Sequence, residues 1–190
     1  MTPAVRNTRA EIKRVFSRHF ARLGYEGLSL EAVAREVGIR KPSIYHHFPG
    51  GKETLYAEVT LDYVEAQATL LADALTSTGD LDERLVRVIV ATADPSGETT
   101  SFGQRVWEAL DAVDTDTRAQ LSQAYVGRLL SPVEELFRAA IDSGTLVGVD
   151  AGLMGNAFLS MGRAIDLTPD AIEETAQALV DLFLNGARTR

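Results

Sequence analysis

The residues best suited to chemistry lie close together in the first third of the chain, between Ser29 and Lys52. This stretch holds hydroxyl, guanidinium, ammonium and imidazole groups, and the most prominent are Ser29, Arg40, Lys41, Ser43, Tyr45, His46 and Lys52. Guanidinium and ammonium groups pair with phosphate oxygens, whereas hydroxyl and imidazole groups contact either phosphates or base edges. The residue types therefore predict a surface that binds nucleic acid.

The same residues do not form a pattern typical of an enzyme. The chain has no cysteine, which removes thiolate nucleophiles and cysteine-based zinc sites. His46 and His47 are adjacent, and neighbours on a helix point about 100° apart, so they rarely share a metal. No histidine follows His47, no glycine-rich phosphate loop is found, and the carboxylates are scattered. We therefore expect no catalytic residues, no metal site and no cofactor.

Charge is distributed unevenly along the chain. The formal net charge is -8, but residues 1–55 carry +5 and residues 56–190 carry -13. A basic module ahead of an acidic body fits a protein that contacts phosphate with one end only. We expect two domains, at residues 1–55 and 56–190. Four cations near the N-terminus, Arg6, Arg9, Lys13 and Arg14, form either an arm that reaches the DNA backbone or a solvated helix face.

Helical periodicity in the first fifty residues predicts three short helices that position the polar groups. Ile12, Val15, Phe16, Phe20 and Leu23 form one apolar stripe, which Gly24 should end. A second helix should begin at Ser29, a capping residue, with Leu28 and Val33 packed as a hydrophobic staple. Gly38 should end it. A third helix should run from about Lys41 to His47, with Pro42 in its first turn.

The rest of the chain is also predicted to be helical, so the fold class is all-α. Helices are expected over residues 52–75, 81–92, 104–112, 117–142, 151–166 and 169–187, with a loop at 94–101 and a kink at Ser131-Pro132. No apolar run approaches the ~18–20 residues that span a bilayer. Residues 1–14 lack the apolar core of a secretory signal. We expect a cytoplasmic protein with no membrane partner.

Several fixed spacings together resemble one known family. The sequence SLEAVAREVGI at residues 29–39, SIYHHF at 43–48 and KETL at 52–55 is similar to the DNA-binding domain of the TetR family of bacterial regulators. Phe16, Phe20 and Gly24-Tyr25 fit the first helix of that family, so the resemblance covers about residues 9–56. It implies a homodimer in which each subunit has a three-helix head and a larger helical body that binds an effector.

The resemblance also assigns roles to individual residues of the head. It implies that Ser29 contacts a phosphate, that Lys52 clamps another, and that five residues match the DNA-facing positions. Those five are Lys41, Pro42, Ser43, Tyr45 and His46. Two departures stand out. Gly50-Gly51 look like a one-residue insertion before Lys52, and Arg40 replaces the usual capping Ser or Thr. Because arginine cannot accept a hydrogen bond, we predict that Arg40 contacts a phosphate or a base instead.

The effector pocket and the dimer interface are predicted mainly from the resemblance. It implies a pocket within about residues 63–163, and the candidate lining residues are Phe102, Trp107, Tyr125, Met154, Phe158 and Met161. The alternative is that these residues are ordinary core. The resemblance likewise favours a homodimer through the C-terminal helices, although their apolar stripes are equally suited to packing within one subunit.

The predicted function is a ligand-responsive transcriptional regulator that binds a palindromic double-stranded DNA operator. Most members of the family are repressors that a small molecule releases from the operator. Two alternatives stay open: an activator or a DNA-binding protein without a ligand, and a helical ligand-binding or scaffolding protein that does not bind DNA. The basic residues of the head favour DNA binding over the last of these.

Overall fold

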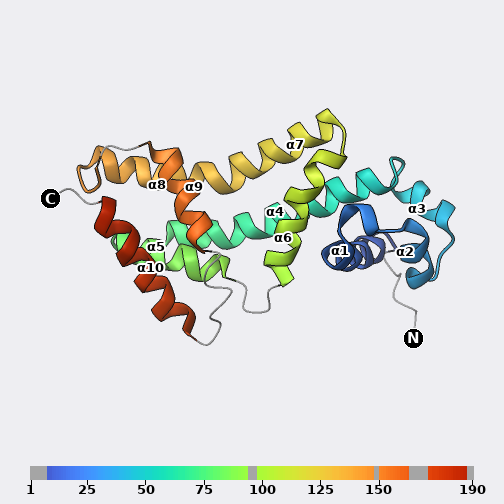
Figure 1. Cartoon of the computed structure of the whole chain (residues 1–190), viewed down its shortest axis with the longest axis horizontal. Coiled ribbons are helices and arrows are strands. Elements are labelled where there is room, and N and C mark those ends of the chain that lie inside the picture. Colours follow the sequence, from blue (N-terminus) through green and yellow to red (C-terminus); the bar gives the residue numbers. More distant parts are fainter. Residues whose placement is uncertain (1–7, 94–97, 148–149, 163–170, 188–190) are drawn as a thin grey trace. The chain divides into compact units, whose positions relative to one another are not determined.

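The computed structural model describes residues 8–93, 98–147, 150–162 and 171–187, and none of these lies in a β-strand. The helices of these ranges are shown in Figure 1. They confirm the predicted all-α fold class. The helices have these bounds: α1 Thr8–Gly27, α2 Leu30–Val37, α3 Lys41–His47, α4 Lys52–Thr76, α5 Leu81–Thr92, α6 Glu98–Ala109, α7 Thr115–Tyr125, α8 Ser131–Asp142, α9 Ala151–Gly162 and α10 Ile172–Ala187.

The described residues form two compact units. The head unit contains residues 8–62 and 101–121, and the body unit contains the remaining described residues from 63 onward. This division differs from the predicted boundary between residues 55 and 56. The long helix α4 contributes to both units, and most of α6 packs with the N-terminal helices through contacts that are distant in sequence. Local sequence patterns do not report such long-range contacts.

Helix α1 bends where the sequence predicts that it should end. Gly24 has φ 68° and ψ -179°, which is not helical, and helical turns continue on both sides of it as far as Gly27. Positive φ is easily reached by glycine and costly for most other residues. The predicted apolar stripe is buried at Ile12, Val15, Phe16 and Phe20. Leu23 is the exception, because it is 43% exposed just before the bend.

The two short helices follow the predicted helix–turn–helix pattern. Gly38 has φ 79°, and its backbone N–H lies 3.2 Å from the Arg35 carbonyl, while the Ile39 N–H donates to the Ala34 carbonyl at 2.9 Å. These two bonds complete a glycine-type helix end. Pro42 lies in the first turn of α3, as predicted. The predicted cap at Ser29 is wrong in one respect: Ser29 has the extended backbone of an N-cap, but its side chain makes no cap hydrogen bond.

A cluster of aromatic rings forms the centre of the head unit. The Phe20 ring lies with its centroid 5.5 Å from Tyr56 on α4 and 5.2 Å from Phe102 on α6. The Tyr56 hydroxyl is buried and donates to the Val106 carbonyl at 2.9 Å. Burial raises the pKa of Tyr56 to about 12. The cluster therefore fixes three helices, α1, α4 and α6, to one another.

The core of the body unit is built from a second aromatic group. Phe137 on α8, Phe158 on α9 and Phe183 on α10 lie with centroids 5.3 to 5.6 Å apart. The predicted interruption near Ser131-Pro132 is confirmed. The chain forms a π-helical segment, Val126–Leu130, directly before α8, and Pro132 occupies the first turn of that helix. Helix α6 begins at Glu98, inside the predicted loop at 94–101, and residues 94–97 lie outside the described ranges.

The start of α7 gives a prediction about pH. The Asp114 carboxylate accepts a hydrogen bond from the Thr117 backbone N–H at 2.7 Å, and this bond is the main reason why the pKa of Asp114 is lowered. A carboxyl group with a lowered native pKa stabilises the fold above its unfolded value of about 3.9, and this contribution is lost as the pH falls through the native value.

We therefore expect Asp114→Asn to lower the urea midpoint at pH 7, and the difference from the wild type to shrink as the pH falls below about 4. Asn can still accept the hydrogen bond from Thr117, so this variant tests the charge alone. Asp116→Asn makes the same charge change two residues later and serves as the control. Equal curves for the wild type and Asp114→Asn at every pH would contradict the prediction.

Candidate nucleic-acid interface

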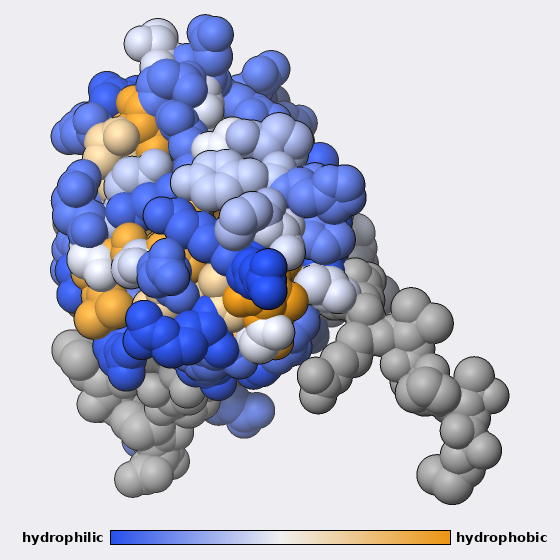
Figure 2. Space-filling model, turned by 90° about the vertical axis from the view of Figure 1, so that its right-hand side faces the viewer, coloured by the Kyte–Doolittle hydropathy of each residue, from blue (hydrophilic) through white to orange (hydrophobic). Residues whose placement is uncertain are grey.

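The candidate DNA-binding residues lie on the outside of α3 and the segments beside it. Arg40, Lys41, Pro42, Tyr45 and His46 are exposed, and Ser43 is half-buried. Ile44 and Phe48, one turn apart, are both completely buried and fix α3 to the rest of the head. Figure 2, which views the side of the molecule that bears α2 and α3, shows a mainly hydrophilic surface. The helix therefore exposes cationic and hydroxyl groups, while its buried apolar residues fix it to the head.

Tyr45 packs against the glycine pair that follows α3. Gly51 has φ 63°, and a Cβ atom there would lie 2.7 Å from Cε1 of Tyr45. Only glycine leaves room for the ring at this distance. Tyr45 nevertheless remains 46% exposed, in agreement with its predicted surface position. The extra glycine therefore allows the chain to turn beneath the ring, and Gly51 donates its N–H to the Phe48 carbonyl at 2.8 Å.

Lys52 is the first residue of α4, as predicted, and its ammonium group has a partner that the sequence did not reveal. Its Nζ lies 4.4 Å from the centroid of the Tyr25 ring, a cation–π contact between α4 and α1. Burial raises the pKa of Tyr25, with smaller contributions from Glu53, Glu26 and Asp114. Tyr25 therefore holds the lysine beside the N-terminus of α4, where backbone N–H groups and the ammonium group can share a phosphate.

The basic residues of α1 are paired with carboxylates of the head. Arg9 bonds both oxygens of Glu58, at 2.5 and 2.6 Å, and its guanidinium lies 4.7 Å from the Phe48 ring centroid. Lys13 pairs with Asp62 and, at 3.7 Å, with Glu58. Arg14 pairs with Glu11 within the helix. For the three described cations, these contacts favour the solvated helix face over the arm that reaches the DNA backbone, and Arg6 lies outside the described residues.

The two neighbouring histidines differ in their surroundings. His46 is exposed, whereas His47 is half-buried with its ring centroid 6.5 Å from that of Phe48. Their own rings lie 5.6 Å apart and nearly perpendicular. Within the ranges that the structure describes, no group of three or more His, Asp or Glu side chains is arranged to hold a metal ion.

The six candidate pocket residues are not gathered in one unit. Phe102 and Trp107 belong to the head unit, where Phe102 is buried against Phe20 and Trp107 is 39% exposed. The other four belong to the body unit: Tyr125 and Met161 are half-buried, and Met154 and Phe158 lie in the core. A hollow on the body unit, between α4 and the π-helical segment, is lined by none of the six. The pocket assignment stays a prediction.

Comparisons with known proteins agree with this geometry. Residues 17–59 match the model of the bacterial regulatory proteins of the tetR family. The transcriptional regulator LmrA of Bacillus subtilis is 35% identical over 74 residues, a match that covers 39% of each chain. The negative transcriptional regulator IcaR of the icaADBC biofilm operon of Staphylococcus aureus is 21% identical over 180 residues, covering 87% of this chain and 92% of IcaR.

Solved structures extend the similarity over nearly the whole chain. The TetR-family regulator PfmR of Thermus thermophilus is 28% identical, with a TM-score of 0.74 over 92% of this chain and 97% of PfmR. The structure of AibR in complex with isovaleryl coenzyme A and operator DNA has a TM-score of 0.73 at 22% identity, over 93% of this chain and 97% of AibR.

An α2–α3 pair with an exposed cationic second helix defines the helix-turn-helix class of transcriptional regulators. The head matches the TetR family model over residues 17–59, and the whole fold is similar to solved structures of TetR-family regulators. Among the described residues, no helix is long and apolar enough to cross a membrane.

Proposed function

We propose that this chain is a repressor that binds a palindromic operator as a homodimer and is released from it by a small molecule. The observation that most supports this proposal is that Arg40, Lys41 and Tyr45 are exposed at the recognition helix. Ile44 and Phe48, which hold the same segment on the head, are completely buried. A recognition helix must be rigidly held and must present several donors at once to read a major groove.

Repression and ligand response are proposed from the relatives. IcaR is a negative transcriptional regulator, and AibR binds both isovaleryl coenzyme A and operator DNA. For this chain we propose the same two activities with an effector of unassigned chemistry, bound in the helical body. If the effector weakens operator binding by some factor, operator DNA must weaken effector binding by the same factor. We also propose that the protein is not an enzyme and that it acts in the cytoplasm, where the chromosome lies.

A gel-shift titration over a salt series tests the proposal. The probe is the DNA immediately upstream of the gene that encodes this chain, with an excess of unrelated competitor DNA. We expect a discrete complex whose affinity falls steeply as salt rises, because several phosphates are neutralised. If this DNA gives no complex, the protein is used to select binding sequences from a random pool of duplexes. Failure to enrich any palindrome would refute DNA binding and favour a scaffolding role.

The proposed dimer gives a second prediction. Leu153 on α9 and Leu182 on α10 are 62% and 68% exposed, although large apolar side chains are usually buried. Both lie in the body unit. We expect Leu153→Asp with Leu182→Asp to convert the protein to a monomer in sedimentation analysis, because two carboxylates cannot be buried without partners.

A matched variant separates loss of the interface from added charge. Leu70 on α4 is also a large exposed apolar residue, at 46%, and lies outside the last two helices. Leu70→Asp should leave the dimer intact. If the double variant remains a dimer at micromolar concentration, α9 and α10 do not form the interface through these two residues.

A further inference from the structure

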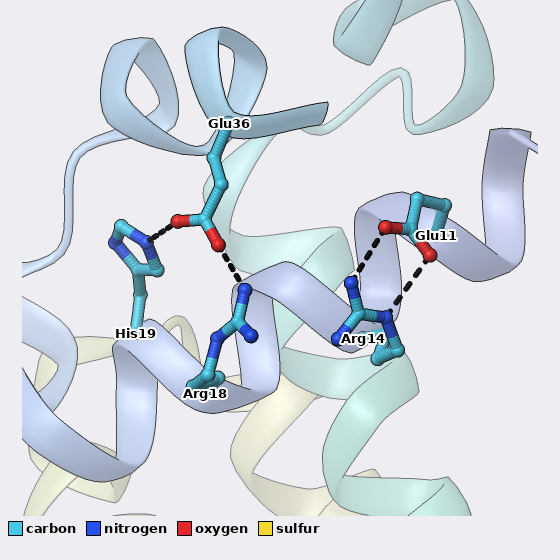
Figure 3. Close-up of polar contacts among 5 residues, drawn as sticks. All are labelled: Glu11, Arg14, Arg18, His19 and Glu36. Carbon is cyan, nitrogen blue, oxygen red and sulfur yellow. Dashed lines mark hydrogen bonds and ion pairs between the residues drawn. The ribbon is translucent and has the colours of Figure 1, made fainter. Parts of the chain in front are cut away.

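A polar contact joins α1 to α2 at a buried histidine (Figure 3). His19 on α1 is 8% exposed, and its Nε2 atom lies 2.6 Å from Oε2 of Glu36 on α2. Arg18, the neighbour of His19 in sequence, pairs with the other oxygen of the same carboxylate. One carboxylate of α2 is therefore held by two side chains of α1.

The two contacts differ in how firmly they fix the carboxylate. Arg18 is 54% exposed, and surface ion pairs of this kind contribute little on average. The His19 ring is enclosed, and its second nitrogen, Nδ1, is buried without a hydrogen-bond partner. Because Nε2 faces a carboxylate acceptor, we assign the ring proton of neutral His19 to Nε2. Glu36 is then the partner that satisfies this buried donor, so displacing Glu36 leaves the donor unpaired.

The position of Glu36 links this contact to the candidate DNA-binding surface. Glu36 lies two residues before Gly38, where the chain turns toward α3, and four residues before Arg40. The buried residues of α2 are all apolar: Leu30, Val33 and Ala34. Apolar contacts are not directional, whereas a hydrogen bond to a buried donor fixes the position and rotation of the end of α2.

We propose that His19 and Glu36 are positioning residues that set the placement of α3, and hence the selectivity of the protein for its operator over other DNA. Neither residue contacts DNA in this proposal, which rests on the DNA binding proposed above. A misplaced α3 loses contacts with base edges, but the contacts of the head with phosphates depend less on exact placement. Selective affinity should therefore fall more than affinity for unrelated DNA.

The chain supplies a matched control in the same unit. Glu11 pairs with Arg14 three residues away, within α1, and its side chain is 41% exposed, the same fraction as Glu36. Figure 3 shows the two carboxylates, one bonded within α1 and the other bonded between α1 and α2. Glu36→Ala and Glu11→Ala remove the same charge from the same unit, but only Glu36→Ala breaks the contact between helices.

The experiment measures affinity for the operator and for a scrambled duplex at one salt concentration. We expect Glu36→Ala and His19→Leu to lower the ratio of the two affinities by roughly tenfold, the size expected for a charge-assisted hydrogen bond. Glu11→Ala should leave the ratio within about twofold. His19→Gln, whose amide can still donate to Glu36, should recover most of the ratio. Circular dichroism checks that each variant is folded.

Three outcomes separate the possibilities. If the wild type shows no preference for any duplex, the proposed function is refuted, and the inference that rests on it is refuted with it. If Glu36→Ala lowers both affinities equally, the contact only stabilises the fold, and the positioning role is refuted. An unchanged ratio in Glu36→Ala and His19→Leu, with operator binding intact in the wild type, overturns the inference as well.

Discussion

Replacing Arg40, Lys41 and Tyr45 together by alanine should lower operator affinity at least about 100-fold, to the level of unrelated DNA. A well-formed contact to a base edge contributes roughly 1–3 kcal/mol of discrimination, so losing several such contacts removes most of the selective affinity. All three side chains are exposed, and the buried residues that hold α3, Ile44 and Phe48, are unchanged. The head should therefore remain folded. Fluorescence anisotropy with a labelled operator, at fixed salt, measures the effect.

The control must remove two positive charges from elsewhere on the surface. Arg118 on α7 and Arg138 on α8 are 45% and 47% exposed and pair with carboxylates. Arg118→Ala with Arg138→Ala should change operator affinity less than about threefold, since only nonlocal electrostatics is affected. If the triple variant of α3 bound the operator as well as the wild type does, the assignment of α3 as the recognition helix would be wrong.

The elements of the head could be predicted from sequence because their signals are local. Periodic apolar residues, Gly38 and Pro42 determined α2 and α3 almost to the residue, since a glycine helix end and a first-turn proline act within a few positions. Ser29 shows the limit of such signals. Its backbone has the expected cap geometry, but no rule of sequence specifies that its side chain leaves the cap bond unmade.

The contacts that position the candidate site could not be predicted, because they join residues far apart in the chain. Lys52 meets Tyr25, and the buried ring of His19 meets Glu36. Neither the residue types nor their positions in the sequence mark these residues as partners. Their proximity depends on how α1 packs against α2 and α4, which periodicity alone does not determine. The only sequence feature that bears on the second contact is the spacing of His19, which lies at helical intervals from Val15, Phe16 and Leu23 of the apolar stripe.

The same limit applies to the predicted effector pocket. Phe102, an aromatic pocket candidate from the middle of the chain, has a ring that packs against Phe20, and the residue belongs to the head unit. Composition identifies apolar residues without showing which core they enter. The observed packing makes Phe102 a structural link between α6 and α1, and this link has a measurable consequence.

Phe20→Ala should destabilise the head unit by about 3–5 kcal/mol, the usual cost of removing a buried phenylalanine. Phe20 is completely buried and contacts Phe16, Tyr56 and Phe102, with ring centroids 6.3, 5.5 and 5.2 Å away. Phe102→Ala should destabilise the same unit, since its ring fills the other side of this cluster. Urea unfolding gives the free energies, and amide hydrogen exchange shows where protection is lost.

The location of the lost protection tests the structural link directly. In Phe20→Ala, exchange should rise in α1 and also in residues 102–121, although these segments are about eighty positions apart, because they share one core. Phe158→Ala, which removes an equally buried ring from the body unit, should instead raise exchange in α8, α9 and α10. If Phe20→Ala left residues 102–121 protected, α6 would not depend on the head core.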